Sequence, residues 1–124
     1  MPRVLIVDDE AAIVRVLKEG LEIHGFTIDC AFNGAEAVER VKENPPDAIV
    51  MDLSMPVMDG IKATQEIRRL TQGATIPILI LTARGEDWDE EAGLKAGANL
   101  FVTKPVSLRQ LAKELHRLIE AQQS

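Results

Sequence analysis

The sequence is poor in aromatic residues, has no tyrosine and contains a single cysteine. Aromatic residues make up 3% of the 124 residues, whereas hydrophobic residues make up 46%. These proportions argue against disorder and predict a core built from aliphatic side chains. The single cysteine, Cys30, cannot form an internal disulfide bond, which fits a reducing cytoplasm. We expect Cys30 to be a small buried side chain.

Long apolar runs and an excess of positive charge are also missing. No apolar run approaches the roughly 20 residues that span a bilayer, and the N-terminus lacks the pattern of a signal peptide. The net charge is −6 at pH 7. Direct nucleic-acid binding is not expected, because it needs a basic patch. The length suits one domain over residues 1–124, which we expect to be cytoplasmic and without membrane contact.

What the chain does contain is a set of short apolar runs separated by helical patterns. The runs cover residues 4–7, 26–32, 48–51, 76–81 and 100–102. The run at 26–32 alternates apolar and polar residues in part, which is typical of an edge strand. The others do not alternate, which indicates strands that are covered on both faces, as in a parallel sheet.

Helical periodicity follows each run. It is clearest over residues 107–121, where Ser107 precedes Gln110 at the spacing of a capping box. The segment 86–96 is the weakest helix, because its apolar content is low and acidic residues crowd its start. Such residues favour a helix N-terminus through the dipole, and here they are Glu86, Asp87, Asp89, Glu90 and Glu91. The alternation of strands and helices predicts an α/β fold, a doubly wound parallel sheet with helices on both faces.

The residues directly after four of the runs are mostly polar. They are Asp8, Asp9 and Glu10, then Asp52, then Thr82 and Ala83, and finally Thr103, Lys104 and Pro105. In open parallel sheets, functional residues gather outside the carboxyl ends of the strands. If these runs are neighbouring strands, a spacing of about 4.8 Å keeps the set within about 14 Å. Ionised carboxylates this close repel one another, and a hard divalent cation such as Mg²⁺ relieves the repulsion.

Each of these residues has a simpler interpretation when it is taken alone. The acidic run 8–10 could cap the first helix, Asp52 could belong to a turn, and Thr82 could be an ordinary strand residue. Two other pairs are expected to have no part in a site: Asp59-Gly60 as a turn, and Arg68-Arg69 as a solvated helix face.

Five motifs carry a resemblance to a known family. They are "DDE" (8–10), "DLSMPVMDG" (52–60), "TA" (82–83), "GAN" (97–99) and "KP" (104–105). In this order the motifs resemble the receiver domain of two-component response regulators, the CheY-like family. The resemblance implies a five-stranded parallel sheet in the order 2-1-3-4-5 with five helices.

The resemblance also implies that Asp52 is the phosphoacceptor. A histidine kinase or a phosphotransfer protein would pass a phosphoryl group to its carboxylate in a Mg²⁺-dependent reaction. Asp8, Asp9, Asp52 and the backbone carbonyl of Ser54 would hold the Mg²⁺ ion, Asp8 largely through water. The side chains of Ser54 and Arg84 would tune the lifetime of the acyl phosphate.

Further roles follow from the same resemblance. Thr82, Ala83 and Lys104 would form the phosphoryl-binding set. Thr82 and Lys104 would bind the phosphoryl oxygens, and Ala83 would keep the entry small. Thr82 and Phe101 would form the switch, although Phe101 lacks the hydroxyl of the tyrosine that often stands there. The peptide bond before Pro105 would be cis.

A receiver of this kind is a switch and not a turnover enzyme. Its partner surface would be residues 86–121, formed by the helix at 86–96, the strand at 100–102 and the helix at 107–121. We expect a monomer or weak dimer. The cognate kinase, the target and the phosphoryl lifetime remain open. It also remains open whether the chain acts alone or belongs to a longer regulator.

Two other functions are considered. A phosphatase of the haloacid-dehalogenase type also uses an aspartyl nucleophile, but it carries Asp-x-Asp after strand 1, where this chain has Asp8-Asp9. A flavodoxin-like electron carrier needs a phosphate-cradling loop at that place, and the acidic run 8–10 would repel the phosphate. A receiver that switches without phosphorylation has no specific support.

Overall fold

Five parallel strands form a central sheet in the order β2-β1-β3-β4-β5, which confirms the expected order and the edge position of β2. The computed structural model describes residues 1–123. The strands are β1 (Arg3–Val7), β2 (Thr27–Ala31), β3 (Ala48–Met51), β4 (Ile78–Thr82) and β5 (Leu100–Thr103).

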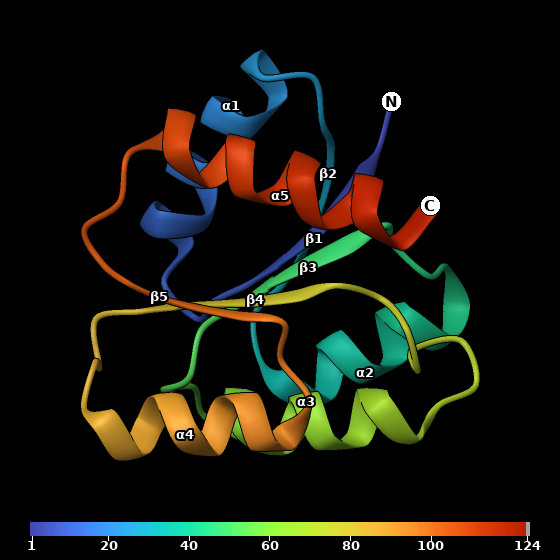
Figure 1. The fold of residues 1–124 in the computed structure, drawn as a ribbon, viewed down its shortest axis with the longest axis vertical. Helices are drawn as coiled ribbons and strands as arrows, with labels where there is room; N and C mark the ends of the chain where they lie inside the picture. Colours follow the sequence, from blue (N-terminus) through green and yellow to red (C-terminus); the bar gives the residue numbers. More distant parts are fainter. Residues whose placement is uncertain (124) are drawn as a thin grey trace.

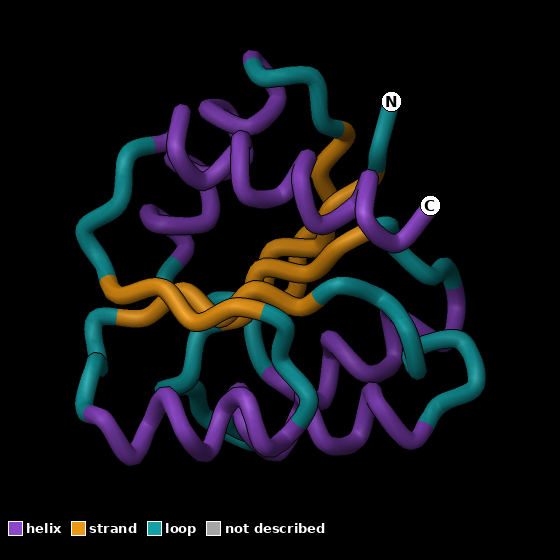
Figure 2. The backbone as a smooth tube through the Cα atoms, viewed as in Figure 1, coloured by secondary structure: helices purple, strands orange, loops and turns teal. Residues whose placement is uncertain are grey.

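Helices cover both faces of the sheet. They are α1 (Ala11–Ile23), α2 (Gly34–Glu43), α3 (Gly60–Arg69), α4 (Asp87–Ala96) and α5 (Leu108–Gln123). α1 and α5 lie on one face, and α2, α3 and α4 lie on the other (Figure 1). Figure 2 shows the sheet as a central layer between the two helical layers. The doubly wound α/β fold is therefore confirmed.

Alternate residues of each strand enter opposite cores. Val4 and Ile6 of β1 pack with α1 and α5, whereas Leu5 and Val7 pack with α2 and α3. Each of these four side chains is at most 1% exposed. Burying one such side chain stabilises the fold by about 1.5–3 kcal/mol. The apolar runs are unbroken because both faces of the strands are covered.

Side chains fix the starts of several helices. Asn33 caps α2, and Asp59 caps α3 by accepting a hydrogen bond from the Lys62 N–H at 2.9 Å. Ser107 Oγ accepts from the Gln110 N–H at 3.0 Å, which confirms Ser107 as the cap of α5. Asp59 is thus structural, as expected, but it caps α3 and does not form a turn with Gly60, which is the first residue of the helix.

Element boundaries differ from the sequence patterns by a few residues. β4 begins at Ile78 and not two residues earlier, because Pro77 has no N–H to donate to the ladder. The Pro77 carbonyl still accepts from the Ile49 N–H at 2.9 Å. α4 begins at Asp87, and α5 continues to Gln123. Within residues 1–123, none of the helices has the length and apolar character of a membrane span.

Two expectations about single residues are wrong. Cys30 is only half-buried, because β2 lies at the edge of the sheet. Arg68 does not lie on a solvated helix face, whereas Arg69 does. Burial lowers the pKa of the Arg68 guanidinium. Its N–H groups donate to four acceptors in the loops on either side of β4 and α4: the carbonyls of Gly73, Ile76 and Gly97 and the Asn99 side chain.

Candidate functional site

Backbone hydrogen bonds between strands continue for one residue past the ends of β3 and β5, and they fix the positions of the polar residues that follow. The Asp52 N–H donates to the Val7 carbonyl at 2.9 Å, and the Lys104 N–H donates to the Thr82 carbonyl at 2.7 Å. Asp52 and Lys104 therefore both lie at the carboxyl ends of the strands, which are on the left of Figure 1. The bond between Lys104 and Pro105 is cis, as the resemblance implies.

Three carboxylates meet at the carboxyl ends of the strands. Oxygens of Asp8, Asp9 and Asp52 lie within 4.8 Å of one another. Asp8 is 2% exposed and Asp52 is 7% exposed, whereas Asp9 is exposed. Lys104 Nζ lies 3.3 Å from Asp8 Oδ2 and compensates part of the negative charge. A set of hard oxygen donors on one open edge fits Mg²⁺, which keeps several waters in its shell.

The environment of Asp52 changes its proton affinity. Burial, and then the Asp8 carboxylate, raises the pKa of Asp52 above 3.8. The Lys104 ammonium, the Thr82 hydroxyl and the Leu53 N–H oppose this rise in the pKa. The Leu53 N–H donates to Asp52 Oδ1 at 2.9 Å.

An open pocket of about 470 Å³ lies over these carboxylates. Its lining residues come from the ends of four strands: Asp9, Glu10, Asp52, Ser54, Thr82, Ala83, Arg84 and Lys104. Asp8 does not line the pocket, but its buried carboxylate adds negative charge beside Asp9 and Asp52. The pocket thus brings together most of the site residues expected from the sequence.

Thr82 and Phe101, the two residues expected to form the switch, lie on one face of two neighbouring strands. Thr82 is 1% exposed, and its Oγ1 accepts a hydrogen bond from the Arg84 N–H at 3.1 Å. Phe101 pairs in register with Ile80, which is two residues before Thr82. The Phe101 ring is half-buried and packs into the core on the side of α3 and α4.

The loop after Asp52 returns closely to the strand end. The Gly60 N–H donates to the Leu53 carbonyl at 2.9 Å, and a methyl group at position 60 would overlap the Asp52 carbonyl oxygen. Val57 in this loop has a φ of 71°, a conformation that is unfavourable for a β-branched residue. Because only glycine leaves room for the Asp52 carbonyl oxygen, Gly60 lets the loop approach the Asp52 backbone closely.

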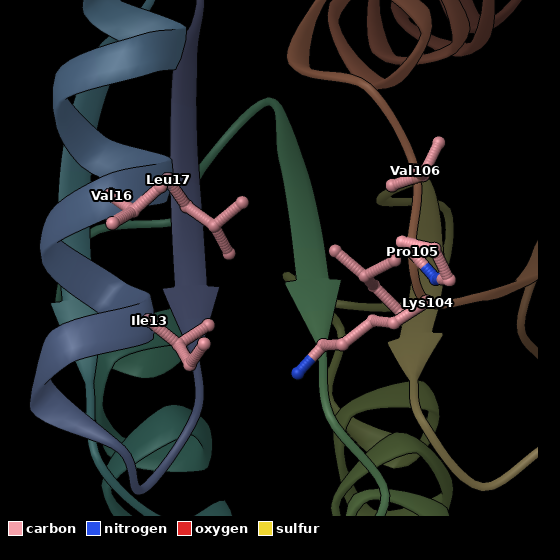
Figure 3. Close-up of a pocket in the computed structure, with 7 residues that line it drawn as sticks. Ile13, Val16, Leu17, Lys104, Pro105 and Val106 are labelled. Atoms are coloured by element: carbon pink, nitrogen blue, oxygen red, sulfur yellow. The ribbon is translucent and has the colours of Figure 1, made fainter.

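An apolar hollow of about 250 Å³ adjoins the acidic pocket. Figure 3 shows it between α1, with Ile13 and Leu17, and the segment after β5, with Pro105 and Val106. The carbon stem of Lys104 lines this hollow, while Lys104 also lines the acidic pocket. Apolar packing of the stem therefore helps to hold the ammonium beside Asp8.

Sequence reasoning missed Asp89. This residue was expected to act only as an acidic residue at a helix N-terminus, but it is fully buried. Its Oδ1 accepts from Arg84 Nε at 3.0 Å, and Arg84 Nη1 donates to Ser54 Oγ at 3.1 Å. The signal available in the sequence is Gly93, one helical turn after Asp89 and also buried. A small residue at that spacing indicates the face that packs on the sheet.

Fold and site together define an α/β protein with a pocket at the carboxyl ends of its strands where three carboxylates offer oxygen ligands. The sequence model of the family "Response regulator receiver domain" matches residues 4–116. The chain belongs to this family, the receivers of two-component signalling. Membership favours the receiver over the phosphatase and the electron carrier.

Individual relatives agree with this assignment. The chain is 40% identical over 118 residues to the transcriptional regulatory protein PrrA of Mycobacterium tuberculosis, which covers 95% of this chain and 50% of the relative. The chain thus spans about half the length of the curated relatives it matches. The Francisella response regulator 1452 receiver domain has a TM-score of 0.89 at 33% identity, covering 98% of both chains.

A second structure bears on the metal. The receiver domain of the sensor histidine kinase PA1611 of Pseudomonas aeruginosa has a TM-score of 0.90 at 34% identity, covering 96% of this chain and 98% of the other. That structure holds a magnesium ion in its active-site cleft.

Proposed function

We propose that Asp52 accepts a phosphoryl group from a histidine kinase or a phosphotransfer protein, and that residues 1–124 act as one phosphorylation-controlled receiver domain. The observation that carries the proposal is the buried Asp52 carboxylate with its raised pKa, grouped with Asp8, Asp9 and Lys104 on one strand edge. The reaction transfers one group once per signal, so the chain is a switch and not a turnover enzyme.

The transfer forms one bond and breaks another. A carboxylate oxygen of Asp52 attacks the phosphorus, the bond from phosphorus to the donor nitrogen or oxygen breaks, and the donor atom keeps the electron pair and takes up a proton. Asp52 Oδ1 already accepts from the Leu53 N–H, which favours Oδ2 as the attacking atom. Phosphoryl transfer needs mainly positioning and charge neutralisation.

Mg²⁺ would be held by Asp8, Asp9, Asp52 and the backbone carbonyl of Ser54, with Asp8 acting largely through water. When bound, the ion neutralises the charge of the carboxylates and of the incoming phosphoryl group. The donor set supports this assignment because all three side chains offer oxygen ligands within reach of one another.

Thr82 and Lys104 would bind the phosphoryl oxygens. Since Thr82 Oγ1 accepts from the Arg84 N–H, its own hydroxyl hydrogen is available to donate. Ala83, which lines the pocket, would keep the entry to the site small. Movement of Thr82 toward the phosphoryl group would vacate space on the face where Phe101 packs. Phe101 has no hydroxyl, so its response would rest on packing alone.

The signal would leave through the face formed by residues 86–121. Trp88 and Leu94 of α4 are 63% and 44% exposed, and exposed apolar side chains are typical of protein-binding surfaces. We propose that a downstream protein binds this face in the cytoplasm, and that the receiver itself is a monomer or weak dimer. The net charge of −6 supports a protein partner over nucleic acid.

The test is covalent labelling. The protein is incubated with acetyl phosphate and Mg²⁺, and its intact mass is measured. We expect a gain of one phosphoryl group in the wild type and in Asp87→Asn, whose carboxylate is exposed on α4. We expect no gain in Asp52→Asn. Labelling that persists in Asp52→Asn, or no labelling of the wild type, would contradict the proposal.

A further inference from the structure

An ion pair between the buried Asp89 carboxylate and the 42% exposed Arg84 side chain joins α4 to the acidic pocket. Asp89 of α4 is 0% exposed, and its Oδ1 lies 3.0 Å from both Nε and Nη2 of Arg84. Among residues 1–123, Asp89 Oδ2 has no hydrogen-bond partner. A buried carboxylate with one cationic partner holds that partner firmly, because separation leaves an uncompensated charge away from water.

The other contacts of Arg84 lead to the pocket. Its Nη1 donates to Ser54 Oγ at 3.1 Å, and its backbone N–H donates to Thr82 Oγ1 at 3.1 Å. Arg84 is one of the residues that line the pocket over Asp52. The guanidinium carbon also lies 5.6 Å from the centre of the Trp88 ring. Arg84 therefore stands between α4 and the pocket and contacts both.

Apolar packing contributes little to the attachment of α4. The buried residues of α4 are Asp89 and Gly93, whereas α3, which has the same length of 10 residues, buries Ala63, Thr64 and Ile67. The ion pair thus takes the place that an apolar side chain holds in the other helices.

We propose that Asp89 is a positioning residue. It fixes the Arg84 guanidinium at the rim of the Asp52 pocket, and there Arg84 shields a phosphoryl group on Asp52 from water. Asp89 fixes Arg84 in the unphosphorylated protein as well. The shielding rests on the function proposed above.

The chemistry of arginine determines the direction of the effect. Hydrolysis of the acyl phosphate requires a water oxygen to attack phosphorus while the bond to the Asp52 oxygen breaks, which releases inorganic phosphate and restores the carboxylate. A guanidinium has donors and no acceptor, so it cannot take a proton from that water. A fixed Arg84 in the lining of the pocket therefore blocks the approach of water without activating it, and this slows hydrolysis.

The first test does not involve phosphorylation. Asp87 and Asp89 flank Trp88, the single tryptophan, but only Asp89 is buried against Arg84. We expect Arg84→Met and Asp89→Asn to change Trp88 fluorescence emission in the same way, and Asp87→Asn to leave it unchanged. Wild-type emission in Asp89→Asn would overturn the proposal, as would an equal change in Asp87→Asn.

The double variant Arg84→Met/Asp89→Asn guards against a folding defect, because it removes both charges and leaves neither unpaired. Circular dichroism checks that each variant keeps its helical content. We expect the double variant to have the emission of Arg84→Met.

The second test measures the phosphoryl lifetime. The variants are labelled with acetyl phosphate and Mg²⁺, the donor is removed, and the loss of the added mass is followed. We expect about fivefold faster loss in Arg84→Met, in Asp89→Asn and in the double variant, with Asp87→Asn at the wild-type rate. A wild-type rate in Asp89→Asn beside a faster rate in Arg84→Met would refute the role of Asp89. If the wild type takes up no phosphoryl group, the proposed function fails, while the fluorescence test still decides whether Asp89 fixes Arg84.

Discussion

At Asp52, burial and the neighbouring Asp8 carboxylate raise the pKa above 3.8, so the folded chain binds a proton there more tightly than the unfolded chain does. Stability depends on pH through the difference in bound protons between the two states. When the folded state binds more, stability falls as the pH rises from about the unfolded pKa through the raised folded pKa. At neutral pH without metal, the ionised Asp52 therefore destabilises the fold.

Replacing this carboxylate should increase stability. We expect Asp52→Asn to raise the midpoint of thermal unfolding by a few degrees at neutral pH in the presence of a chelator. The gain should shrink as the pH falls through the raised pKa of Asp52, because the wild-type carboxyl group then becomes neutral too. Thermal unfolding followed by circular dichroism at several pH values measures both effects.

The exposed Asp87 provides the control for this prediction. Asp87→Asn removes one negative charge from the surface, and its effect on stability should stay within about 0.5 kcal/mol. A lower midpoint in Asp52→Asn than in the wild type, or a gain that does not change with pH, would contradict the electrostatic explanation.

Single residues differ in how far the sequence can reveal them. Asp52 and Lys104 could be predicted because each directly follows a strand, and the carboxyl ends of parallel strands lie at the same end of the sheet. The burial of Asp89 and Arg68 was not predicted, since each stands beside other charged residues and resembles part of a solvated face. For Asp89 the only sequence signal is the small residue Gly93 one turn later. The burial of both residues arises from tertiary contacts: Asp89 with Arg84 of the preceding loop, and Arg68 with acceptors in other loops.

At the scale of elements, the strands were the most predictable part. The apolar runs of β1, β3 and β4 are covered on both faces, and this leaves a sequence signal that needs no knowledge of neighbours. The ends of elements were less predictable, because they depend on single backbone hydrogen bonds, as at Pro77. The weak pattern over 86–96 corresponds to a real feature of α4, which buries Asp89 and Gly93 and no large apolar side chain.

A helix with so little apolar burial should open locally at a low free energy. We expect the amides of α4 to exchange with solvent deuterium faster than those of α3, which has the same length and buries Ile67. Hydrogen exchange followed by mass spectrometry under native conditions measures this. Equal protection of the two helices would show that the Arg84–Asp89 pair holds α4 as firmly as apolar packing holds α3.

At the scale of the whole molecule, the fold brings together charges that are far apart in the sequence. Asp8, Asp52 and Lys104 meet only when β1, β3 and β5 occupy one sheet. The unfolded chain has no such cluster, so an ion that binds the cluster binds the folded state alone. Binding of this kind adds stability that depends on the ion concentration.

Magnesium should therefore stabilise the whole domain. At a free Mg²⁺ concentration of tenfold the dissociation constant, the added stability is about 1.4 kcal/mol, and the midpoint of thermal unfolding should rise accordingly. Asp9→Asn should lose most of this rise. Since Asp9 is exposed, the variant should still fold. Asp87→Asn should keep the full rise. Thermal scans with and without Mg²⁺, at matched ionic strength, make the comparison. An undiminished Mg²⁺ effect in Asp9→Asn would mean that the ion acts on the general negative charge of the chain and not at the carboxylate cluster around Asp52.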